Sequence, residues 1–261
     1  MDKRIEVIKN AAKLGGEKML HGIPTDGVIS KEGHANIVTA TDIATEKIII
    51  SIIKEHFPHD AILGEEETSA KIENPLGQEH LWVIDPIDGT NNFRSDRNFS
   101  AVSIGYVTSG IVQLGAIFNP YRNELFFAER GKGAFSNDKK IQVSDQKDLD
   151  EACIETGNCY DTEGTRRNLT NVLQLPVTPW VLIRASAALA MADVACGRLD
   201  LFFNRGQRSW DNAAASLLLE EAGAVIKNLD GTEPTILSPD TVTGNPVLVE
   251  AFLQATNNGK Q

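Results

Sequence analysis

One short segment restricts the fold of this chain more than any other. Residues 82–90 read WVIDPIDGT, so an apolar run typical of a buried strand leads into two aspartates three positions apart. Pro86 has no N–H to donate, and its ring restricts Asp85 to an extended conformation. Asp85 and Asp88 can therefore point to the same place, with the Ile87 carbonyl as a third oxygen. Such hard oxygen ligands favour Mg²⁺, Mn²⁺ or Ca²⁺ over softer metals.

The two residues after Asp88 are of a kind that can bind an anion. Gly89 and Thr90 would present backbone N–H groups to a phosphate, as the first turn of a helix does. Taken alone, Asp-Pro is far more often a strand end and Asp-Gly a turn. The complete nonapeptide after an apolar strand favours the functional interpretation.

Two more acidic segments can join this group. Glu65, Glu66 and Glu67 follow Gly64 at the end of the apolar run 61–63, although an isolated acidic triplet is usually a solvated loop. Asp211 follows Trp210 in the first turn of a predicted Ala- and Leu-rich helix, where the helix dipole alone would favour an aspartate.

Hydrophobic periodicity predicts a mixed α and β protein. Helices are expected at 3–20 and from an N-cap at Thr41 or Asp42 to just before Pro58, packed side by side. Short buried strands follow at 61–63 and 81–84, and an antiparallel meander at 100–143. Strands and helices then alternate, with a last helix at 210–222 between Ser209 as N-cap and Gly223 at C′. The polar segment 145–151 suggests two parts, residues 1–146 and 147–261.

Composition excludes some classes of protein. The net charge of −11 and the absence of any Lys/Arg run longer than a pair disfavour direct binding to nucleic acid or to an anionic membrane. Three cysteines without CxxC spacing argue against a disulfide framework and a zinc site, and predict a cytoplasmic protein. No segment is apolar enough to be expected to span a membrane.

Together the segments resemble the inositol monophosphatase family, part of a superfamily of lithium-sensitive sugar and nucleotide phosphatases. The matching pieces are NIVTATD at 36–42, GEE at 64–66, residues 82–93, residues 184–189, and Trp210-Asp211 with residues 221–223. The resemblance implies a five-layer αβαβα sandwich of the inositol monophosphatase and fructose-1,6-bisphosphatase type, α+β or α/β in class. It also implies a homodimer that uses Mg²⁺, with Mn²⁺ as a substitute, to hydrolyse a phosphate monoester.

The resemblance assigns roles position by position. One metal would be held by Glu65, Asp85 and the Ile87 carbonyl, a second by Asp85, Asp88 and Asp211, and any third would share Glu65. The catalytic group would comprise Glu65, Thr90, Asp88 and Asp42, of which Thr90 and Glu65 orient the attacking water. Gly89 and Thr90 would hold the phosphate, Lys31 and Glu66 would support the site, and the substrate would meet Asp88, Ala185, Ser186, Asn204 and Asp211.

The chain departs from the family pattern mainly on the substrate side. Asn36 replaces a common aspartate, Ala185 a glycine, and Asn204 a glutamate that bonds a sugar hydroxyl. Among Arg184, Arg205 and Arg208, one could meet a second phosphate, although a solvated surface position is expected for at least two of the three.

Three kinds of function remain open on the sequence. The first is hydrolysis of myo-inositol monophosphate by metal-activated water, favoured by the TNNF continuation at 90–93. The second is a sister activity on fructose 1,6-bisphosphate, histidinol phosphate or 3′-phosphoadenosine phosphates. The third is a non-catalytic RNA- or protein-binding regulator, or a cation buffer, neither of which requires Gly89 and Thr90 beside four intact carboxylates.

Overall fold

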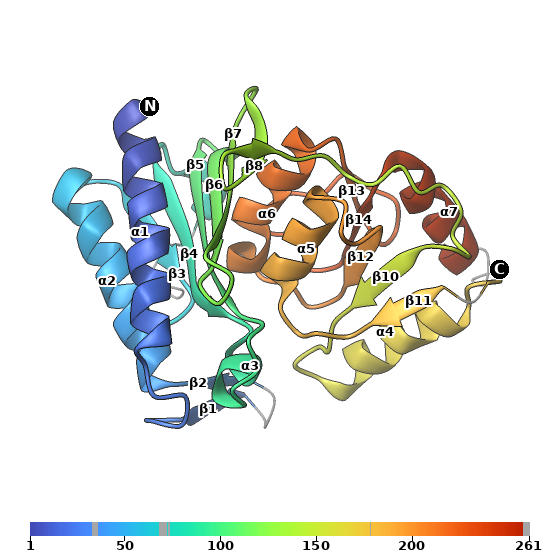
Figure 1. The fold of residues 1–261 in the computed structure, drawn as a ribbon, viewed down its shortest axis with the longest axis horizontal. Coiled ribbons are helices and arrows are strands. Elements are labelled where there is room, and N and C mark those ends of the chain that lie inside the picture. Colours follow the sequence, from blue (N-terminus) through green and yellow to red (C-terminus); the bar gives the residue numbers. More distant parts are fainter. Residues whose placement is uncertain (33–35, 68–71, 73, 178, 258–261) are drawn as a thin grey trace.

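The computed structural model describes residues 1–32, 36–67, 72, 74–177 and 179–257, which form five stacked layers (Figure 1). Helices α1 (Asp2–Leu20) and α2 (Ala40–His56) cover one face of a first sheet. Helices α5 (Ala187–Ala195) and α6 (Ser209–Glu221) lie between the two sheets. Helices α4 (Thr162–Leu173) and α7 (Pro246–Asn257) cover the outer face of the second sheet. The expected αβαβα sandwich is confirmed.

The first sheet has the order β3-β4-β5-β6-β7-β8-β9, with β3 parallel to β4 and every later pair antiparallel. Its strands are β3 (Ala61–Gly64), β4 (Leu81–Asp88), β5 (Ala101–Thr108), β6 (Ile111–Asn119), β7 (Glu124–Glu129), β8 (Gly133–Ser136) and β9 (Lys139–Lys140). The predicted meander is therefore confirmed. Since β3 and β4 run parallel, their carboxyl ends lie at the same edge and bring Glu65 towards Asp85.

The second sheet has the order β11-β10-β12-β14-β13. Its strands are β10 (Cys153–Thr156), β11 (Trp180–Leu182), β12 (Leu201–Asn204), β13 (Val225–Asn228) and β14 (Thr241–Gly244). Strand β10 is parallel to β11 and β12, and β14 is antiparallel to β12 and β13. A small hairpin of β1 (Ile29–Glu32) and β2 (Asn36–Val38), the short helix α3 (Thr90–Arg94) and the 3₁₀ turn Pro75–Gly77 complete the described elements.

Helix α6 sits very close to the first sheet because two glycines make room for it. Gly105 on β5 and Gly115 on β6 are directly paired across the strands. A Cβ atom on Gly115 would lie 2.5 Å from the Ala214 carbonyl oxygen, and one on Gly105 would lie 2.8 Å from the Ala213 Cβ. This contact determines how far the first turn of α6, which carries Asp211, stands from β4.

Three boundaries differ from the sequence prediction. Helix α2 begins after Thr39, whose side chain accepts from the Asp42 N–H while the Asp42 carboxylate accepts from the Thr39 N–H, so Asp42 is the third residue of a capping box and not the cap. Likewise α6 is capped at Arg208, and Ser209 is its first residue. Strand β4 continues through the proline to Asp88, because a bulge after Asp85 keeps the chain paired with β5.

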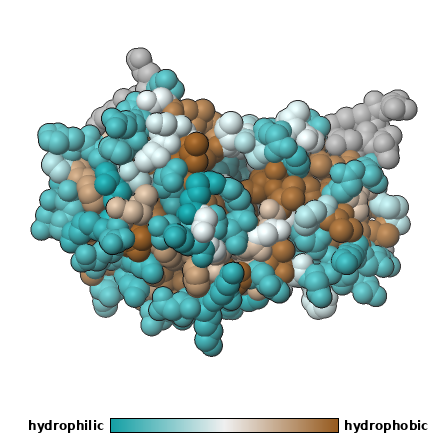
Figure 2. Space-filling view, turned by 90° about the horizontal axis from the view of Figure 1, so that it is seen from above, coloured by the Kyte–Doolittle hydropathy of each residue, from teal (hydrophilic) through white to brown (hydrophobic). Residues whose placement is uncertain are grey.

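The chain crosses from the first sheet to the second between Lys140 and Cys153. Helices α5 and α6 belong to the later half but share one apolar core with strands of the earlier half. The division at 146 and 147 stays a prediction. Among the described residues, no helix has the length and apolar character needed to cross a membrane. The face drawn in Figure 2 is covered mainly by hydrophilic residues, with separate apolar patches.

Candidate metal and phosphate site

Three carboxylates from distant parts of the chain meet at one point. Asp85 and Asp88 come from the end of β4, and Asp211 from the first turn of α6. One oxygen of each lies within 4.8 Å of the others, and the residues are only 2%, 6% and 9% exposed, respectively. The predicted convergence of these three residues is therefore present in the fold.

Backbone and hydroxyl donors anchor one oxygen of each carboxylate. Asp85 Oδ1 accepts from the Ile87 N–H at 3.0 Å, and Asp211 Oδ2 accepts from the Arg208 N–H at 2.7 Å. Asp88 Oδ2 accepts from the Ser186 hydroxyl and, at 2.9 Å, from the Ala188 N–H. Donors of this kind orient the other oxygen of a carboxylate toward a metal.

The electrostatics of this group favour a cation. Desolvation, followed by repulsion from Glu65 and Asp88, raises the pKa of Asp85 well above its ordinary value. Desolvation, followed by repulsion from Asp88, does the same to the pKa of Asp211. None of the ion pairs in the described part of the chain involves Asp85, Asp88 or Asp211. A cluster of hard oxygens without an ion-pair partner among the described residues fits a divalent cation.

Glu65 follows β3 and lines the same cavity, but it lies outside the tight group of three. Its loop is held by Glu46 of α2, whose carboxylate accepts from the Glu66 N–H at 2.9 Å and the Glu67 N–H at 2.8 Å. A side chain on Gly64 would collide with that carboxylate, since a Cβ there would lie 2.6 Å from Glu46 Cδ. The sequence analysis missed Glu46, although it follows Asp42 by one helical turn on the same face.

Thr90 stands between Asp42 and the Ile87 carbonyl. Its hydroxyl oxygen lies 3.0 Å from Asp42 Oδ1 and 3.0 Å from the Ile87 oxygen, and its single proton can serve only one of them at a time. The other Asp42 oxygen is held by Thr39 through its N–H and hydroxyl. Burial raises the pKa of Asp42, and these hydrogen bonds oppose the rise.

Gly89 precedes α3 with φ of +89°, a conformation that a residue with a side chain rarely adopts. A Cβ at this position would also approach the carbonyl oxygens of Phe99 at 3.1 Å and Ala185 at 3.2 Å. The backbone can therefore turn sharply after Asp88. The hydrogen bonds of α3 begin with the Asn92 N–H, which donates to the Gly89 carbonyl at 2.8 Å, so the N–H groups of Gly89 and Thr90 precede them.

These groups open into one cavity of about 360 Å³. Its walls include Glu65, Asp85, Asp88, Thr90 and Asp211, and a second set from the later half of the chain. This second set contains the predicted substrate residues Ala185, Ser186 and Asn204, together with Gly157, Tyr160 and Arg205. Asn36 also lines the cavity, whereas the Lys31 side chain lies outside the described part of the structure.

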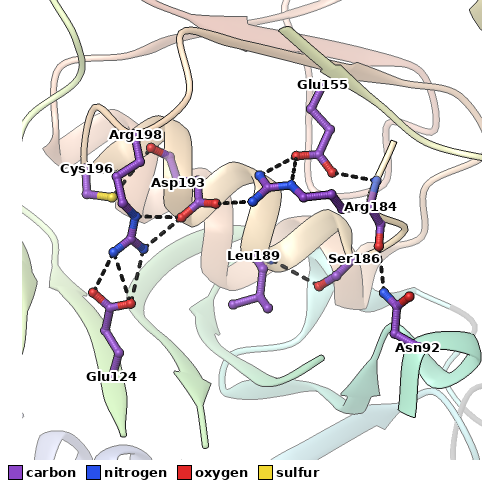
Figure 3. A network of polar contacts seen from close by, with 9 residues as sticks. All are labelled: Asn92, Glu124, Glu155, Arg184, Ser186, Leu189, Asp193, Cys196 and Arg198. Atoms are coloured by element: carbon purple, nitrogen blue, oxygen red, sulfur yellow. Dashed lines mark hydrogen bonds and ion pairs between the residues drawn. The ribbon is translucent and has the colours of Figure 1, made fainter. Parts of the chain in front are cut away.

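The turn that carries Ala185 and Ser186 is held from both sides. Asn92 Nδ2 lies 2.6 Å from the Arg184 carbonyl oxygen and 3.1 Å from that of Ala185, which has φ of +58°. Ser186 caps α5, and its hydroxyl also reaches Asp88. The Arg184 side chain runs the other way, to Glu155 at 2.8 Å and Asp193 at 2.9 Å, in the network of Figure 3.

The three arginines near the substrate positions are placed differently from the expectation. Arg184 is engaged with two carboxylates, and Arg205 is only 8% exposed and bonds Asn168. Only Arg208 is exposed. The expected surface position for at least two of the three is therefore wrong. The sequence carried no signal for this result, because the partners come from β10, α4 and α5.

Tyr160 is a further cavity residue that the sequence analysis missed. Desolvation, together with the nearby Asp211 and Glu65 carboxylates, raises the pKa of its hydroxyl. It belongs to the loop between β10 and α4, where no periodic pattern or motif marks it. Only the tertiary fold brings this loop, and with it Tyr160, to the cavity that the carboxylates line.

Comparison with known proteins agrees with this geometry. The model of the inositol monophosphatase family matches residues 1–261. Inositol monophosphatase 1 of Solanum lycopersicum is 35% identical over 98% of this chain and 95% of its own length. Nus factor SuhB of Escherichia coli K12 is 35% identical over 97% of this chain and 95% of its own.

A solved structure gives the same result at the level of the fold. The extragenic suppressor protein SuhB of Bartonella henselae superposes with a TM-score of 0.90, at 31% identity over 98% of this chain and 99% of that one. The family match extends over the whole chain and includes every segment that builds the carboxylate cluster. The chain is thus a phosphatase that hydrolyses phosphate monoesters, and it belongs to the inositol monophosphatase family.

Proposed function

We propose that the phosphatase uses Mg²⁺, replaceable by Mn²⁺, and that two or three ions work in the site. The observation that carries this proposal is the buried meeting of Asp85, Asp88 and Asp211 in the cavity that Thr90 also lines. Asp85 and the Ile87 carbonyl would hold one ion with Glu65. Asp85, Asp88 and Asp211 would hold a second, and Glu65 would share in a third.

When bound, the ions supply positive charge that lowers the pKa of a water and neutralises the attacking and leaving oxygens. The chain's own residues position the attacking water and the phosphate. With its proton on Asp42, the Thr90 hydroxyl keeps lone pairs that accept a hydrogen bond from the attacking water. Glu65 would accept the second proton of that water, while the N–H groups of Gly89 and Thr90 would hold the phosphate. Glu66 supports this arrangement through its N–H bond to Glu46.

The substrate we propose first is myo-inositol monophosphate, since curated relatives of the chain bear the name inositol monophosphatase. A substrate with two phosphates, such as fructose 1,6-bisphosphate, is the second candidate. The observation that favours it is the neutral amide of Asn204 in the cavity wall, where the family resemblance leads one to expect a carboxylate.

The test is release of inorganic phosphate from a panel of monoesters, with Mg²⁺ and with a chelator. The panel contains inositol 1-phosphate, fructose 1,6-bisphosphate, histidinol phosphate and 3′-phosphoadenosine 5′-phosphate. We expect Mg²⁺-dependent release from at least one, with a preference of about tenfold or more over the others. Equal release with and without the ion would contradict the metal proposal.

Other parts of the proposal rest on the family resemblance. We propose a homodimer and a cytoplasmic location. Trp180 on edge strand β11 and Leu173 at the end of α4 are 73% and 85% exposed, which leaves apolar surface that a second copy would cover. A regulatory role through RNA or protein stays the alternative, and the likeness to a protein named Nus factor supports keeping it. Sedimentation tests the homodimer. A pull-down with a catalytically inactive variant tests the regulatory role.

A further inference from the structure

A buried arginine begins a chain of hydrogen bonds that ends in the cavity. Arg205 is only 8% exposed, and no ion pair in the described part of the chain includes it. Asp240 attracts its charge from beyond ion-pair distance, and Arg167 repels it. One of its terminal nitrogens donates to Asn168 Oδ1 at 3.3 Å, while Nε has no hydrogen-bond partner.

Asn168, which is fully buried on α4, is the next residue in this chain of hydrogen bonds. Its Nδ2 donates to the Gly157 carbonyl at 3.0 Å and to Asn204 Oδ1 at 2.7 Å. The guanidinium can only donate and the carbonyl can only accept, so the Asn168 amide has a single orientation that satisfies both. Reversing it would place N–H against N–H at Arg205 and oxygen against oxygen at Gly157.

The orientation of Asn204 follows from that of Asn168. Because Asn168 supplies an N–H, Asn204 must turn its oxygen toward Asn168. Its Nδ2 is the polar atom left for a molecule in the cavity, and no acceptor among the described residues takes its hydrogens. Gly157 packs on the face of this amide, where a Cβ would lie 2.8 Å from Nδ2, and so limits its rotation.

We propose that the relay Arg205–Asn168–Asn204 makes this wall select phosphate monoesters whose leaving portion carries a second anionic group, a carboxylate or a phosphate. The inference rests on the phosphatase activity and the cavity described above, and between the two candidate substrate classes it favours the one with a second anionic group over myo-inositol monophosphate. Each bond of the relay donates away from the cation, so the last N–H is polarised by a positive charge that lacks a close counter-ion. Charge-assisted hydrogen bonds to an anionic acceptor are about twice as strong as neutral ones.

A carboxylate in place of Asn204 would have the opposite preference. It would accept hydrogen bonds from the hydroxyls of a polyol and repel an anionic group. The amide cannot supply that negative charge, and the relay prevents it from presenting its oxygen. Asn204 is therefore the residue that contacts the substrate, and Asn168 is a positioning residue that determines which end of the Asn204 amide faces the cavity.

Two pairs of substrates isolate this effect with the intact protein and Mg²⁺. Glycerol 3-phosphate and 3-phosphoglycerate differ only by a hydroxymethyl group against a carboxylate. Fructose 1-phosphate and fructose 1,6-bisphosphate differ at carbon 6, which carries a hydroxyl in the first and a phosphate in the second. We expect kcat/KM to favour the anionic member of at least one pair by about tenfold, mainly through KM. The pair that responds identifies the anion as a carboxylate or a phosphate.

Two variants test the relay itself. In Asn204→Asp, a negative charge faces the cavity, and the preference for the anionic member should fall by about tenfold or more. In Asn168→Asp, the carboxylate accepts from both Arg205 and Asn204, so Asn204 turns its oxygen to the cavity and the preference should fall likewise. Asn171→Asp, on the same helix and outside the cavity, adds the same charge and should leave the ratio unchanged.

The outcomes separate the inference from the proposed function. Phosphate release with equal kcat/KM within both pairs, and no change of ratio in either variant, would overturn the relay proposal and leave the phosphatase intact. A changed ratio in Asn204→Asp alone would also contradict the positioning role of Asn168, provided that the Asn168 variant melts cooperatively. If no substrate of either pair, nor inositol 1-phosphate, releases phosphate with Mg²⁺, the proposed function fails together with the inference.

Discussion

At the scale of single residues, the Asp88 side chain makes two kinds of contact. One oxygen is anchored by Ser186 and Ala188, and the carboxylate also belongs to the cluster with Asp85 and Asp211. The Asp88→Asn variant keeps the shape and loses the charge, so turnover should fall by at least about 10²-fold. The measurement is kcat for phosphate release at saturating Mg²⁺, with exposed Asp138→Asn as control.

The fold of Asp88→Asn should survive, because the substitution removes one of several buried like charges. Without metal, its melting temperature should equal or exceed that of the wild type. Full turnover in a folded Asp88→Asn protein would show that the metal site lies elsewhere.

Thr90 should act through its hydroxyl alone. The Thr90→Val variant keeps the volume but cannot bridge Asp42 and the attacking water. We expect kcat to fall by about 10²-fold with little change in KM, since the hydroxyl acts in the chemical step. Thr90→Ser should restore most of the rate. If Thr90→Val keeps the rate of the wild type, the hydroxyl has no role in turnover.

At the scale of elements, the position of α6 depends on the paired glycines Gly105 and Gly115. A Gly115→Ala substitution puts a methyl group against the Ala214 carbonyl, and α6 must move. We expect a loss of about 1–3 kcal/mol in the free energy of unfolding, as in other overpacked cores. Because α6 carries Asp211, Mg²⁺ affinity should weaken as well.

Denaturant unfolding and calorimetric titration with Mg²⁺ measure the two effects. The exposed Ile111→Val, on the same strand as Gly115, is the control and should change stability by less than about 0.5 kcal/mol. Unchanged Mg²⁺ affinity in Gly115→Ala would contradict the idea that the close contact positions Asp211.

At the scale of the whole molecule, Mg²⁺ should stabilise the fold, and more so at higher pH. Folding raises the pKa of Asp85 and Asp211. Between the unfolded and folded pKa values, the native state binds more protons than the unfolded chain, so the contribution of these groups to stability falls as pH rises. Bound Mg²⁺ offsets the repulsion between the ionised carboxylates and so restores the stability that is lost as pH rises. At low pH, protons compete with Mg²⁺ for the same carboxylates.

The difference in melting temperature between Mg²⁺ and chelator should therefore be larger at about pH 8 than at about pH 5.5. Differential scanning calorimetry at the two pH values measures it. The Asp211→Asn variant should reduce the difference in melting temperature between Mg²⁺ and chelator at both pH values. A larger stabilisation at the lower pH would contradict the assignment of these carboxylates as ligands.

Much of this architecture was predictable from local sequence, because local physical chemistry produces it. The meander after Ser100 and the amphipathic helix at the start have periodicities typical of one kind of element, and the apolar run before Asp85 has the length of a strand and is too short for a helix. The segment from Asp85 to Thr90 contains its own turn, so its cluster of oxygens could be predicted without knowledge of the fold.

Other features depend on contacts between segments far apart in the chain. Glu46 supports the Glu65 loop, Arg184 pairs with Glu155 and Asp193, and Asn168 orients Asn204, across separations of up to 36 residues. A polar side chain has the same local pattern whether it faces solvent or a distant partner. The sequence by itself thus determined the elements and the metal-binding motif. Only the tertiary structure decided which end of each polar group faces the cavity, because hydrogen-bond direction depends on partners that folding brings together.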